Sequence, residues 1–368
     1  MTRILSRPVP GTALLLAVSL IATACTSGAT PAPSAPSAAP PTSAASAAAS
    51  AAAATPVVLP PAETTTITIG VTNNLAINQY PSQLANDIGL FQKYGLTVKV
   101  LSMEGAGAAL QSLLAGQIQA ALTGPGNVLS AALTDSPLIM ATMESNYLAY
   151  MLMGGKDIKT GADLKGKSIA ISSLGGVSHA AVVASLSQLG LKASDVIIQG
   201  IGNEASQIAA MVSGAVASAP VSTTGVPKLQ ALGYNVLVDL TKSGVRFGID
   251  GLTLTKAWAA KNPNTILRII AAQLEAQKAM FTKTPLAVTA FQAYTTVDAT
   301  VAKASLDQCL AGLCNKGFGF TKDDFALNRD ILATVSPAVK DVDLGVVGDM
   351  SYLNKLKDLG FNTEIGWP

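Results

Sequence analysis

The segment Ser172–His179 (SSLGGVSH) carries residue types suited to holding a small polar molecule. It follows an expected strand at 168–171 and opens a helix, whose free backbone N–H groups can bond an anionic or strongly polar group. Gly175 and Gly176 allow a ligand to approach the backbone closely. The alternative is simple capping, in which the serine hydroxyls satisfy the helix's own N–H groups.

Three further loops follow predicted strands and carry short amide or hydroxyl side chains, at 72–74, 123–127 and 222–224. In open α/β sheets, ligands bind where the carboxyl ends of strands feed the following helices. The expected ligand-binding residues are therefore Asn73, Asn74, Gly124, Asn127, Ser172, Ser173, Gly175, Ser178, His179, Ser222 and Thr223. Two alternatives stay open. The asparagines can merely serve a turn, and a lone histidine such as His179 is more often structural.

Patterns typical of catalysis are weak in this sequence. Ser178 and His179 are chain neighbours, which does not make a catalytic triad, and no G-x-S-x-G motif occurs. The stretch 200–205 (GIGNEA) mimics a dinucleotide-binding motif, but Ser222 stands where an acidic residue is needed about 20 positions on. One histidine and three cysteines leave no set of metal ligands. We therefore expect a binding protein rather than an enzyme, with no cofactor and no metal.

Residues 1–24 have the layout of an export signal, with two arginines before the apolar stretch 11–24. As a helix this stretch spans about 21 Å, too short for a hydrocarbon core of about 30 Å. Cys25 follows a run similar to the lipobox of bacterial lipoproteins, so we expect lipidation there and anchoring outside the cytoplasm. The alternative is an ordinary secretory signal. Residues 25–62, rich in Ala, Ser and Pro and without charge, are expected to form a flexible tether.

The remaining body, from residue 63 onward, is neutral. It holds all 22 acidic residues and 22 of the 24 basic ones, because two arginines lie in the leader. This balance argues against a nucleic-acid partner, which needs a basic surface. Cys309 and Cys314 are expected to form a local disulfide in an oxidising compartment, and two unrelated thiols are the alternative.

Strand-like and helix-like patterns alternate along the body, which predicts an α/β fold with mostly parallel sheets flanked by helices. Its length exceeds the usual size of one hydrophobic core, so we expect two lobes. Residues 63–152 and 250–368 are assigned to the first lobe, and residues 153–249 to the second. Two crossing strands near 150–156 and 244–252 would join the lobes as a hinge.

Several motifs resemble those of ABC-transporter solute-binding proteins of the nitrate/sulfonate/taurine and thiamine-pyrimidine type. They are 88–98 (IGLFQKYGLTV), 113–120 (LLAGQIQA), 163–170 (DLKGKSIA), 172–179 (SSLGGVSH) and 257–263 (AWAAKNP). The resemblance implies the two-lobed periplasmic-binding-protein type II fold, in which the lobes close on a ligand held between them. It also implies an exported, monomeric importer subunit that delivers a small molecule to a membrane permease.

The candidate loops contain no charged side chain. A doubly charged anion needs stronger donors, so we expect a neutral, pyrimidine-like heterocycle or a monoanion such as a sulfonate, nitrate or carboxylate. Two alternatives to transport stay open: a ligand sensor for a membrane receptor, and an enzyme of the related pyrimidine-synthase type, whose cysteine-rich signature is absent here.

Overall fold

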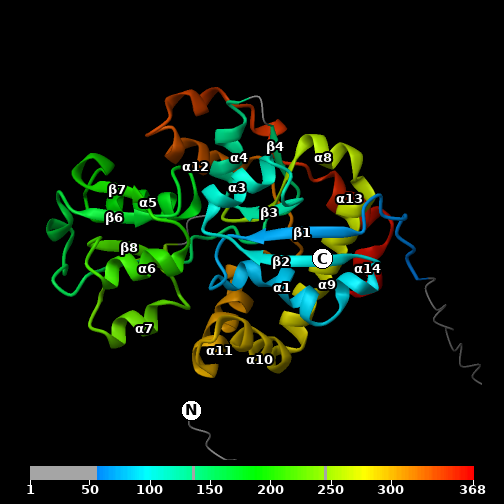
Figure 1. Cartoon of the computed structure of the whole chain (residues 1–368), viewed down its shortest axis with the longest axis horizontal. Coiled ribbons are helices and arrows are strands. Elements are labelled where there is room, and N and C mark those ends of the chain that lie inside the picture. The colour runs from blue at the N-terminus through cyan, green and yellow to red at the C-terminus, as the bar shows by residue number, and fades with distance from the viewer. Residues whose placement is uncertain (1–55, 135–136, 244–246) are drawn as a thin grey trace, which may run out of the picture. The chain divides into compact units, whose positions relative to one another are not determined.

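The computed structural model describes residues 56–134, 137–243 and 247–368, whose strands form two five-stranded sheets (Figure 1). The first sheet, in the order β2-β1-β3-β10-β4, contains β1 (Thr66–Val71), β2 (Thr97–Ser102), β3 (Ala120–Thr123), β4 (Leu138–Met140) and β10 (Gly251–Thr255). The second sheet, in the order β7-β6-β8-β5-β9, contains β5 (Tyr150–Gly154), β6 (Ser168–Ile171), β7 (Ile197–Gly200), β8 (Ser218–Ser222) and β9 (Asn235–Asp239).

Each sheet is mostly parallel and contains one antiparallel strand. In the first sheet, β1 pairs in parallel with β2 and β3, whereas β10 is antiparallel to β3 and β4. In the second sheet, β6 is parallel to β7 and β8, whereas β5 is antiparallel to β8 and β9. The antiparallel strand is in each case the one that the chain enters on arriving from the other sheet. The predicted α/β class with mostly parallel sheets is confirmed.

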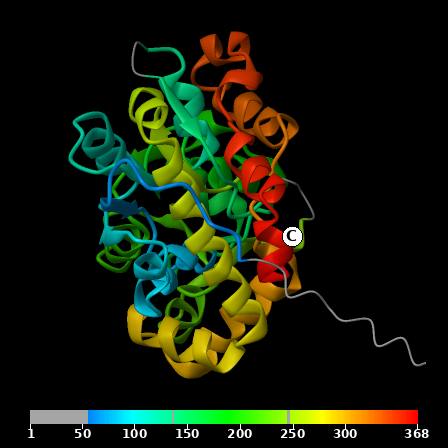
Figure 2. The same cartoon turned by 90° about the vertical axis from the view of Figure 1, so that its right-hand side faces the viewer.

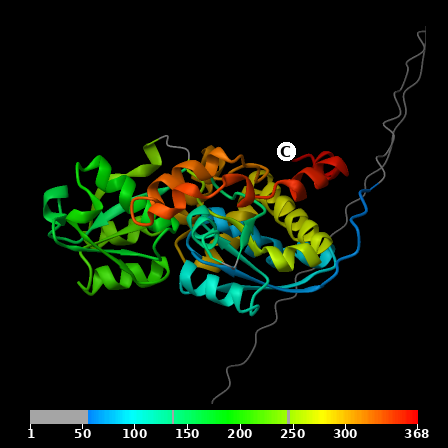
Figure 3. The same ribbon diagram turned by 90° about the horizontal axis from the view of Figure 1, so that it is seen from above.

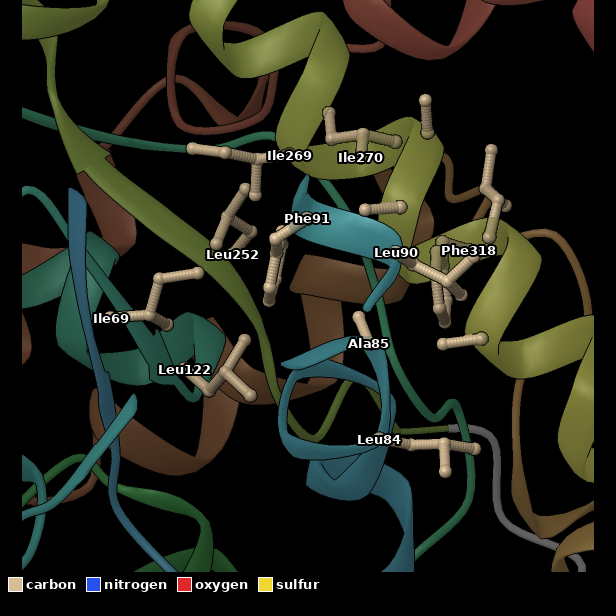
Figure 4. Close-up of a cluster of buried hydrophobic side chains, with 14 of the residues drawn as sticks. Ile69, Leu84, Ala85, Leu90, Phe91, Leu122, Leu252, Ile269, Ile270 and Phe318 are labelled. Atoms are coloured by element: carbon tan, nitrogen blue, oxygen red, sulfur yellow. The ribbon is translucent and has the colours of Figure 1, made fainter. Parts of the chain in front are cut away.

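Helices cover both faces of each sheet. The α-helices are α1 (Tyr80–Asp87), α2 (Leu90–Lys93), α3 (Ala106–Leu114), α4 (Pro125–Ala131), α5 (Val177–Gln188), α6 (Glu204–Val212), α7 (Val226–Ala231), α8 (Lys256–Lys261), α9 (Pro263–Thr282), α10 (Thr284–Thr295), α11 (Ala299–Gln308), α12 (Asp323–Leu332), α13 (Ser351–Asp358) and α14 (Phe361–Ile365). Alternation along the strands explains the two faces, since successive side chains point in opposite directions. Ile69 and Leu122 face a core shared with α1, α2 and α9 (Figure 4), whereas Ala121 faces α3 and α4.

Helix α9 is the longest helix of the described residues and organises the core of the first sheet. It begins at Pro263, whose fixed φ suits the first helical turn. Ile266, Ile270 and Leu274 recur at helical spacing and are fully buried. Helices α13 and α14 lie beside α9 near the C-terminus (Figure 2).

The body begins before residue 63. Residues 57–62, which the sequence analysis assigns to the tether, pack on the first sheet's core, and Leu59 is buried. The Arg268 guanidinium donates to the carbonyl oxygens of Leu59 and Pro60 at 2.8 and 2.7 Å. The cause is the short apolar run at 57–59, which offers side chains that can be buried. Cys25 and most of the expected leader and tether lie outside the described residues.

Two connections join the sheets, at 141–149 between β4 and β5 and before β10 in the return direction. Their backbones are hydrogen-bonded: Glu144 N–H donates to the Asp250 carbonyl at 2.6 Å, and Ile249 N–H donates to the Ser145 carbonyl at 2.9 Å. The first connection thus precedes the expected 150–156, because residues 150–154 pair with β8 and β9 in the second sheet. That these connections flex as a hinge stays a prediction.

Two further features tie the connections to the rest of the chain. Cys309 and Cys314 form a disulfide, and the loop that it closes accepts a hydrogen bond from Ser145 Oγ at the Leu313 carbonyl, at 2.5 Å. Helix α12 contacts both α4 and α5, so it packs against helices of both sheets (Figures 1 and 3). Its Leu327 packs against the core of the second sheet.

Candidate ligand-binding site

A narrow polar hollow lies where loops of the two sheets meet, with a cavity volume of about 30 Å³, or about 400 Å³ when its open mouth is included. The loop after β1, the start of α4 after β3 and the start of α5 after β6 each supply part of the wall, as expected for the carboxyl ends of parallel strands. The lining residues are Thr72, Asn73, Gln79, Ala106, Gly124, Asn127, Tyr150, Ser172, Val177, Ser178, Glu204, Gln207, Pro220 and Asp250.

Glu204, in the first turn of α6, is a buried carboxylate in this wall. Its Oε1 accepts from Ser222 Oγ at 2.8 Å, and its Oε2 accepts from Asn73 Nδ2 at 2.7 Å. The Oδ1 of Asn73 accepts the Leu75 N–H at 3.1 Å, which fixes the amide with its NH₂ group toward Glu204. Because Asn73 follows β1 and Glu204 precedes β8, this hydrogen bond joins the two sheets' loops.

Asp250 lies on the second connection and is also buried. Its Oδ2 accepts from Asn78 Nδ2 at 3.1 Å. Gln79 Oε1 accepts the backbone N–H groups of Thr72 and Asn73 at 3.0 and 3.1 Å, and its Nε2 donates to Thr72 Oγ1 at 3.1 Å. The NH₂ group of Gln79 thus lies on the side of Asp250, whose pKa the Gln79 amide lowers. The neighbouring amides therefore present donors to Asp250, just as Asn73 does to Glu204.

Burial is the main electrostatic influence on both acids, because it penalises the charged form. It raises the pKa of Asp250 to about 6 against the hydrogen bonds from Gln79 and Asn78. It also raises the pKa of Glu204, against the hydrogen bonds from Ser222 and Asn73. The pKa of the buried Tyr150 phenol is raised by burial and by the charges of Asp250 and Glu204. No Lys, Arg or His of the described residues lines the hollow.

The start of α5 contributes hydroxyl groups that are partly satisfied within the loop. Ser178 Oγ accepts the Ser172 N–H at 2.8 Å and lies 2.8 Å from Ser172 Oγ. His179 is fully buried, and its Nδ1 accepts the Gly175 N–H at 3.1 Å. Burial lowers the pKa of this imidazole, so it is neutral at pH 7. In this position His179 shapes the turn rather than the wall of the hollow.

The residues predicted from the sequence fall into three groups. Asn73, Gly124, Asn127, Ser172 and Ser178 line the hollow, whereas Ser222 and Thr223 line an adjoining one that shares Tyr150. Asn74, Ser173, Gly175 and His179 line neither of these two hollows. Direct ligand contact by any of them stays a prediction.

Sequence reasoning missed the residues that set the charge of the hollow. Glu204 opens the helix after β7, where the rule of strand carboxyl ends applies, but from the sequence the stretch 200–205 is considered only as an imperfect dinucleotide-binding motif. Asp250 lies within 244–252, a range that is assigned from the sequence to the hinge rather than to the binding site. No sequence signal identified Gln79 or Tyr150. Gln79 reaches the hollow from the short turn just before α1, and Tyr150 reaches it from β5.

Backbone contacts join the two parts of the chain beside the hollow. A Cβ added at Gly126, in α4, would overlap the carbonyl oxygen of Gly175, in the loop before α5. A Cβ added at Gly105, before α3, would lie 2.9 Å from the carbonyl carbon of Gly202, before α6. Glycine at positions 126 and 105 thus lets the loops of the two sheets come into backbone contact. Any other residue type there would force the two backbones apart.

The described lining residues include hydroxyls without a histidine or cysteine partner. Within the described ranges, no three or more His, Cys, Asp or Glu side chains are placed to hold a metal ion. Over the same ranges, no helix is both long and apolar enough to cross a membrane.

Comparison with known sequences gives a family match. The family model described as "NMT1/THI5 like" matches residues 77–285, which is more than half of the chain. That range includes both connections and every lining residue except those of the loop after β1. No curated protein matches the chain.

Solved structures with the same fold cover most of the chain. A protein from Bordetella bronchiseptica RB50 is 22% identical with a TM-score of 0.72, over 83% of this chain and 100% of that one. The alkanesulfonate-binding protein SsuA from Xanthomonas axonopodis pv. citri, bound to MOPS, is 16% identical with a TM-score of 0.64. The match covers 76% of this chain and 95% of SsuA. The periplasmic nitrate-binding protein NrtA from Synechocystis PCC 6803 is 15% identical with a TM-score of 0.65. The match covers 83% of this chain and 92% of NrtA. At these identities the likeness shows the fold, that of type II periplasmic binding proteins.

Proposed function

This chain belongs to the NMT1/THI5-like family, and from that premise we propose that it is the extracytoplasmic solute-binding subunit of an ABC importer. It captures a small polar organic solute and delivers it to a membrane permease. The observation that carries the proposal is a polar hollow whose walls come from both sheets, with two hydrogen-bonded connections between them. SsuA and NrtA, which share the fold, are a sulfonate-binding and a nitrate-binding protein.

The proposed mechanism is closure of two lobes around the solute, each built on one of the two sheets, with β5 (150–154) in the second lobe and residues 57–62 in the first. In the open form the hydrogen bond between Asn73 and Glu204 is broken and the contact between Gly126 and Gly175 is lost, so the hollow is accessible. Bound solute bridges both walls and favours the closed form. It must bind the closed form better than the open form, because equal affinity shifts no equilibrium.

The proposed location follows from the leader. Signal cleavage leaves Cys25 as the lipid-bearing first residue, and the segment 25–56 tethers a monomeric body to the outer face of the cell membrane. Multiple acyl chains hold a protein firmly, since each buried methylene contributes about 0.8 kcal/mol.

Two measurements test this function. Native mass spectrometry of freshly purified protein identifies any retained solute, and small-angle scattering compares ligand-free protein with protein to which that solute is returned. We expect the radius of gyration to fall on binding, and unchanged dimensions would contradict closure. Deleting the neighbouring permease genes should abolish uptake of the same solute. Uptake that persists would favour a ligand sensor over a transporter subunit.

A further inference from the structure

We propose that the solute carries a positively charged nitrogen group with at least two N–H donors, which binds the carboxylates of Glu204 and Asp250. The inference rests on the proposed function, because it names the class of solute for the same hollow. Amidinium, guanidinium and primary ammonium groups belong to this class. Three observations carry it: the polarity of the hydrogen bonds around the acids, the charge of the hollow, and an unpartnered amide in its wall.

The first observation is that both acids act as hydrogen-bond acceptors. The amides of Asn73 and Gln79 are fixed by backbone N–H groups at their oxygens, so only their NH₂ groups can face the acids. Ionised carboxylates offer about four acceptor positions each and no donor. Glu204 uses two of these positions, for Asn73 and Ser222. A ligand group that reaches either acid must therefore bring donors of its own.

The second observation is that the negative charge of the hollow has no counterpart. The described wall contains two buried carboxylates and no basic side chain. The ion pairs of the described residues involve other acids, Asp239, Glu275, Asp307 and Asp330. A buried charge without a partner is costly, and an opposite charge of the ligand offsets that cost.

The same charge disfavours the monoanions that the sequence suggested. When both acids are ionised, a sulfonate, nitrate or carboxylate in this hollow adds a third negative charge beside Glu204 and Asp250. From the sequence, a neutral heterocycle or a monoanion is expected because the four candidate loops contain no charged side chain of either sign. Both acids lie away from those loops in the sequence, Glu204 18 positions before Ser222 and Asp250 on the second connection, and folding carries them into the same wall.

The third observation indicates what else the solute presents. Asn127 Nδ2 is buried in the wall without a hydrogen-bond partner. This donor requires an acceptor atom, which a solute can supply. The solute class is therefore a small molecule of mixed polarity, with a cationic donor group for the two acids and an acceptor for Asn127.

A series of ring compounds of matched shape tests the charge preference. Benzamidinium, benzamide and benzoate carry positive, zero and negative charge, and benzenesulfonate, Mg²⁺ and Zn²⁺ complete the panel. Calorimetric titration of ligand-free protein at pH 7 should show benzamidinium binding about tenfold or more tighter than benzamide, because its hydrogen bonds are charge-assisted. Benzoate and benzenesulfonate should not bind. The inference is overturned if either anion or either metal ion binds with the same affinity as benzamidinium, or if no compound of the panel binds.

Paired variants show whether Glu204 is the origin of the preference. Glu204→Gln keeps the shape but removes the charge, and should weaken benzamidinium binding about tenfold while changing benzamide binding little. Asp358→Asn on the exposed face of α13 is the matched control and should bind both compounds as the wild type does. Thermal unfolding verifies that both variants fold. Equal loss of benzamidinium and benzamide binding in Glu204→Gln would indicate a role in shape alone and contradict the proposal.

The dependence on pH gives a second, independent readout. Among the residues that the structure describes, Glu144 and Tyr150 are the titratable groups whose pKa Asp250 raises, and neither supplies a positive charge. Benzamidinium binding should therefore weaken about tenfold from pH 7 to pH 5 as Asp250 is protonated, and Asp250→Asn should flatten this profile. Stronger binding at pH 5 would overturn the inference. If native mass spectrometry instead finds an anion that causes compaction, this inference fails while the proposed function stands.

Discussion

The substitution Gly126→Ala isolates closure from binding chemistry. Gly126 lies in the first turn of α4 and lines no part of the described hollow. Its φ is not in the positive range, so alanine can adopt the same backbone conformation. The added methyl group would overlap the carbonyl oxygen of Gly175, which belongs to the other sheet's loop. In the proposed open form this contact is absent, so the substitution is expected to penalise the closed form alone.

The magnitude follows from the kind of overlap. The obstacle is a backbone oxygen rather than the flexible end of a side chain, so the two loops must separate to relieve it. Overpacking of this kind costs about 1–3 kcal/mol, which corresponds to a loss of ligand affinity of about 5- to 150-fold. Ligand-free stability should change by a few tenths of a kcal/mol, because Ala replaces Gly at an otherwise unstrained helical position.

The assay combines calorimetric titration with small-angle scattering, using the solute that native mass spectrometry identifies. Gly107→Ala is the control, because Gly107 lies at the corresponding start of α3 and a Cβ there meets nothing within 4 Å. We expect the control to bind and compact as the wild type does, and Gly126→Ala to bind weakly and stay extended. Normal affinity and compaction in Gly126→Ala would refute the closure geometry.

Three further predictions concern stability. Burial raises the pKa of Glu144 to about 8 from the ordinary value of 4.5, so its folded carboxyl holds its proton and stability falls as pH rises between these values. Glu144→Gln should gain about 2–4 kcal/mol over wild type near pH 8 and almost nothing near pH 4 in urea unfolding, and a constant difference would contradict this. His179→Ala should cost about 2–4 kcal/mol in thermal unfolding, whereas lost ligand affinity at unchanged stability would place His179 in contact with the solute. Arg268→Met should cost about 1.5–3 kcal/mol and speed proteolysis at residues 57–62, and unchanged proteolysis would refute that anchor.

The fold could be predicted because its signals are local. Alternating apolar residues in 65–71 and the helical stripe from Ile266 to Leu274 each follow from burial of one face, and the structure contains a strand and a helix there. Gly and Ser after β6 pointed to a loop that does line the hollow. The chain order of strands and helices then implied two sheets, since parallel strands need crossover connections.

The charge of the site could not be predicted, because it depends on contacts between residues far apart in the chain. Asn73 and Glu204 are separated by 131 positions, and their hydrogen bond exists only through the packing of both sheets. Whether an acid is buried, and which donors face it, is decided by that packing. The strand register likewise moved the first connection to 141–149, since only pairing with β8 and β9 assigns residues 150–154 to the second sheet.

In the proposed mechanism, Glu204 and Asn73 couple closure of the lobes to the charge of the solute. In the proposed open form Glu204 is accessible to water, whereas closing the structure buries it with neutral donors alone. The desolvation of an ionised carboxylate opposes closure by several kcal/mol unless an opposite charge arrives with it. A cationic solute supplies that charge only in the closed form, where both walls contact it. In this proposal the cation supplies the differential affinity that ligand-driven closure requires, because the hydrogen bond between Asn73 and Glu204 forms only when the two sheets' loops are in contact.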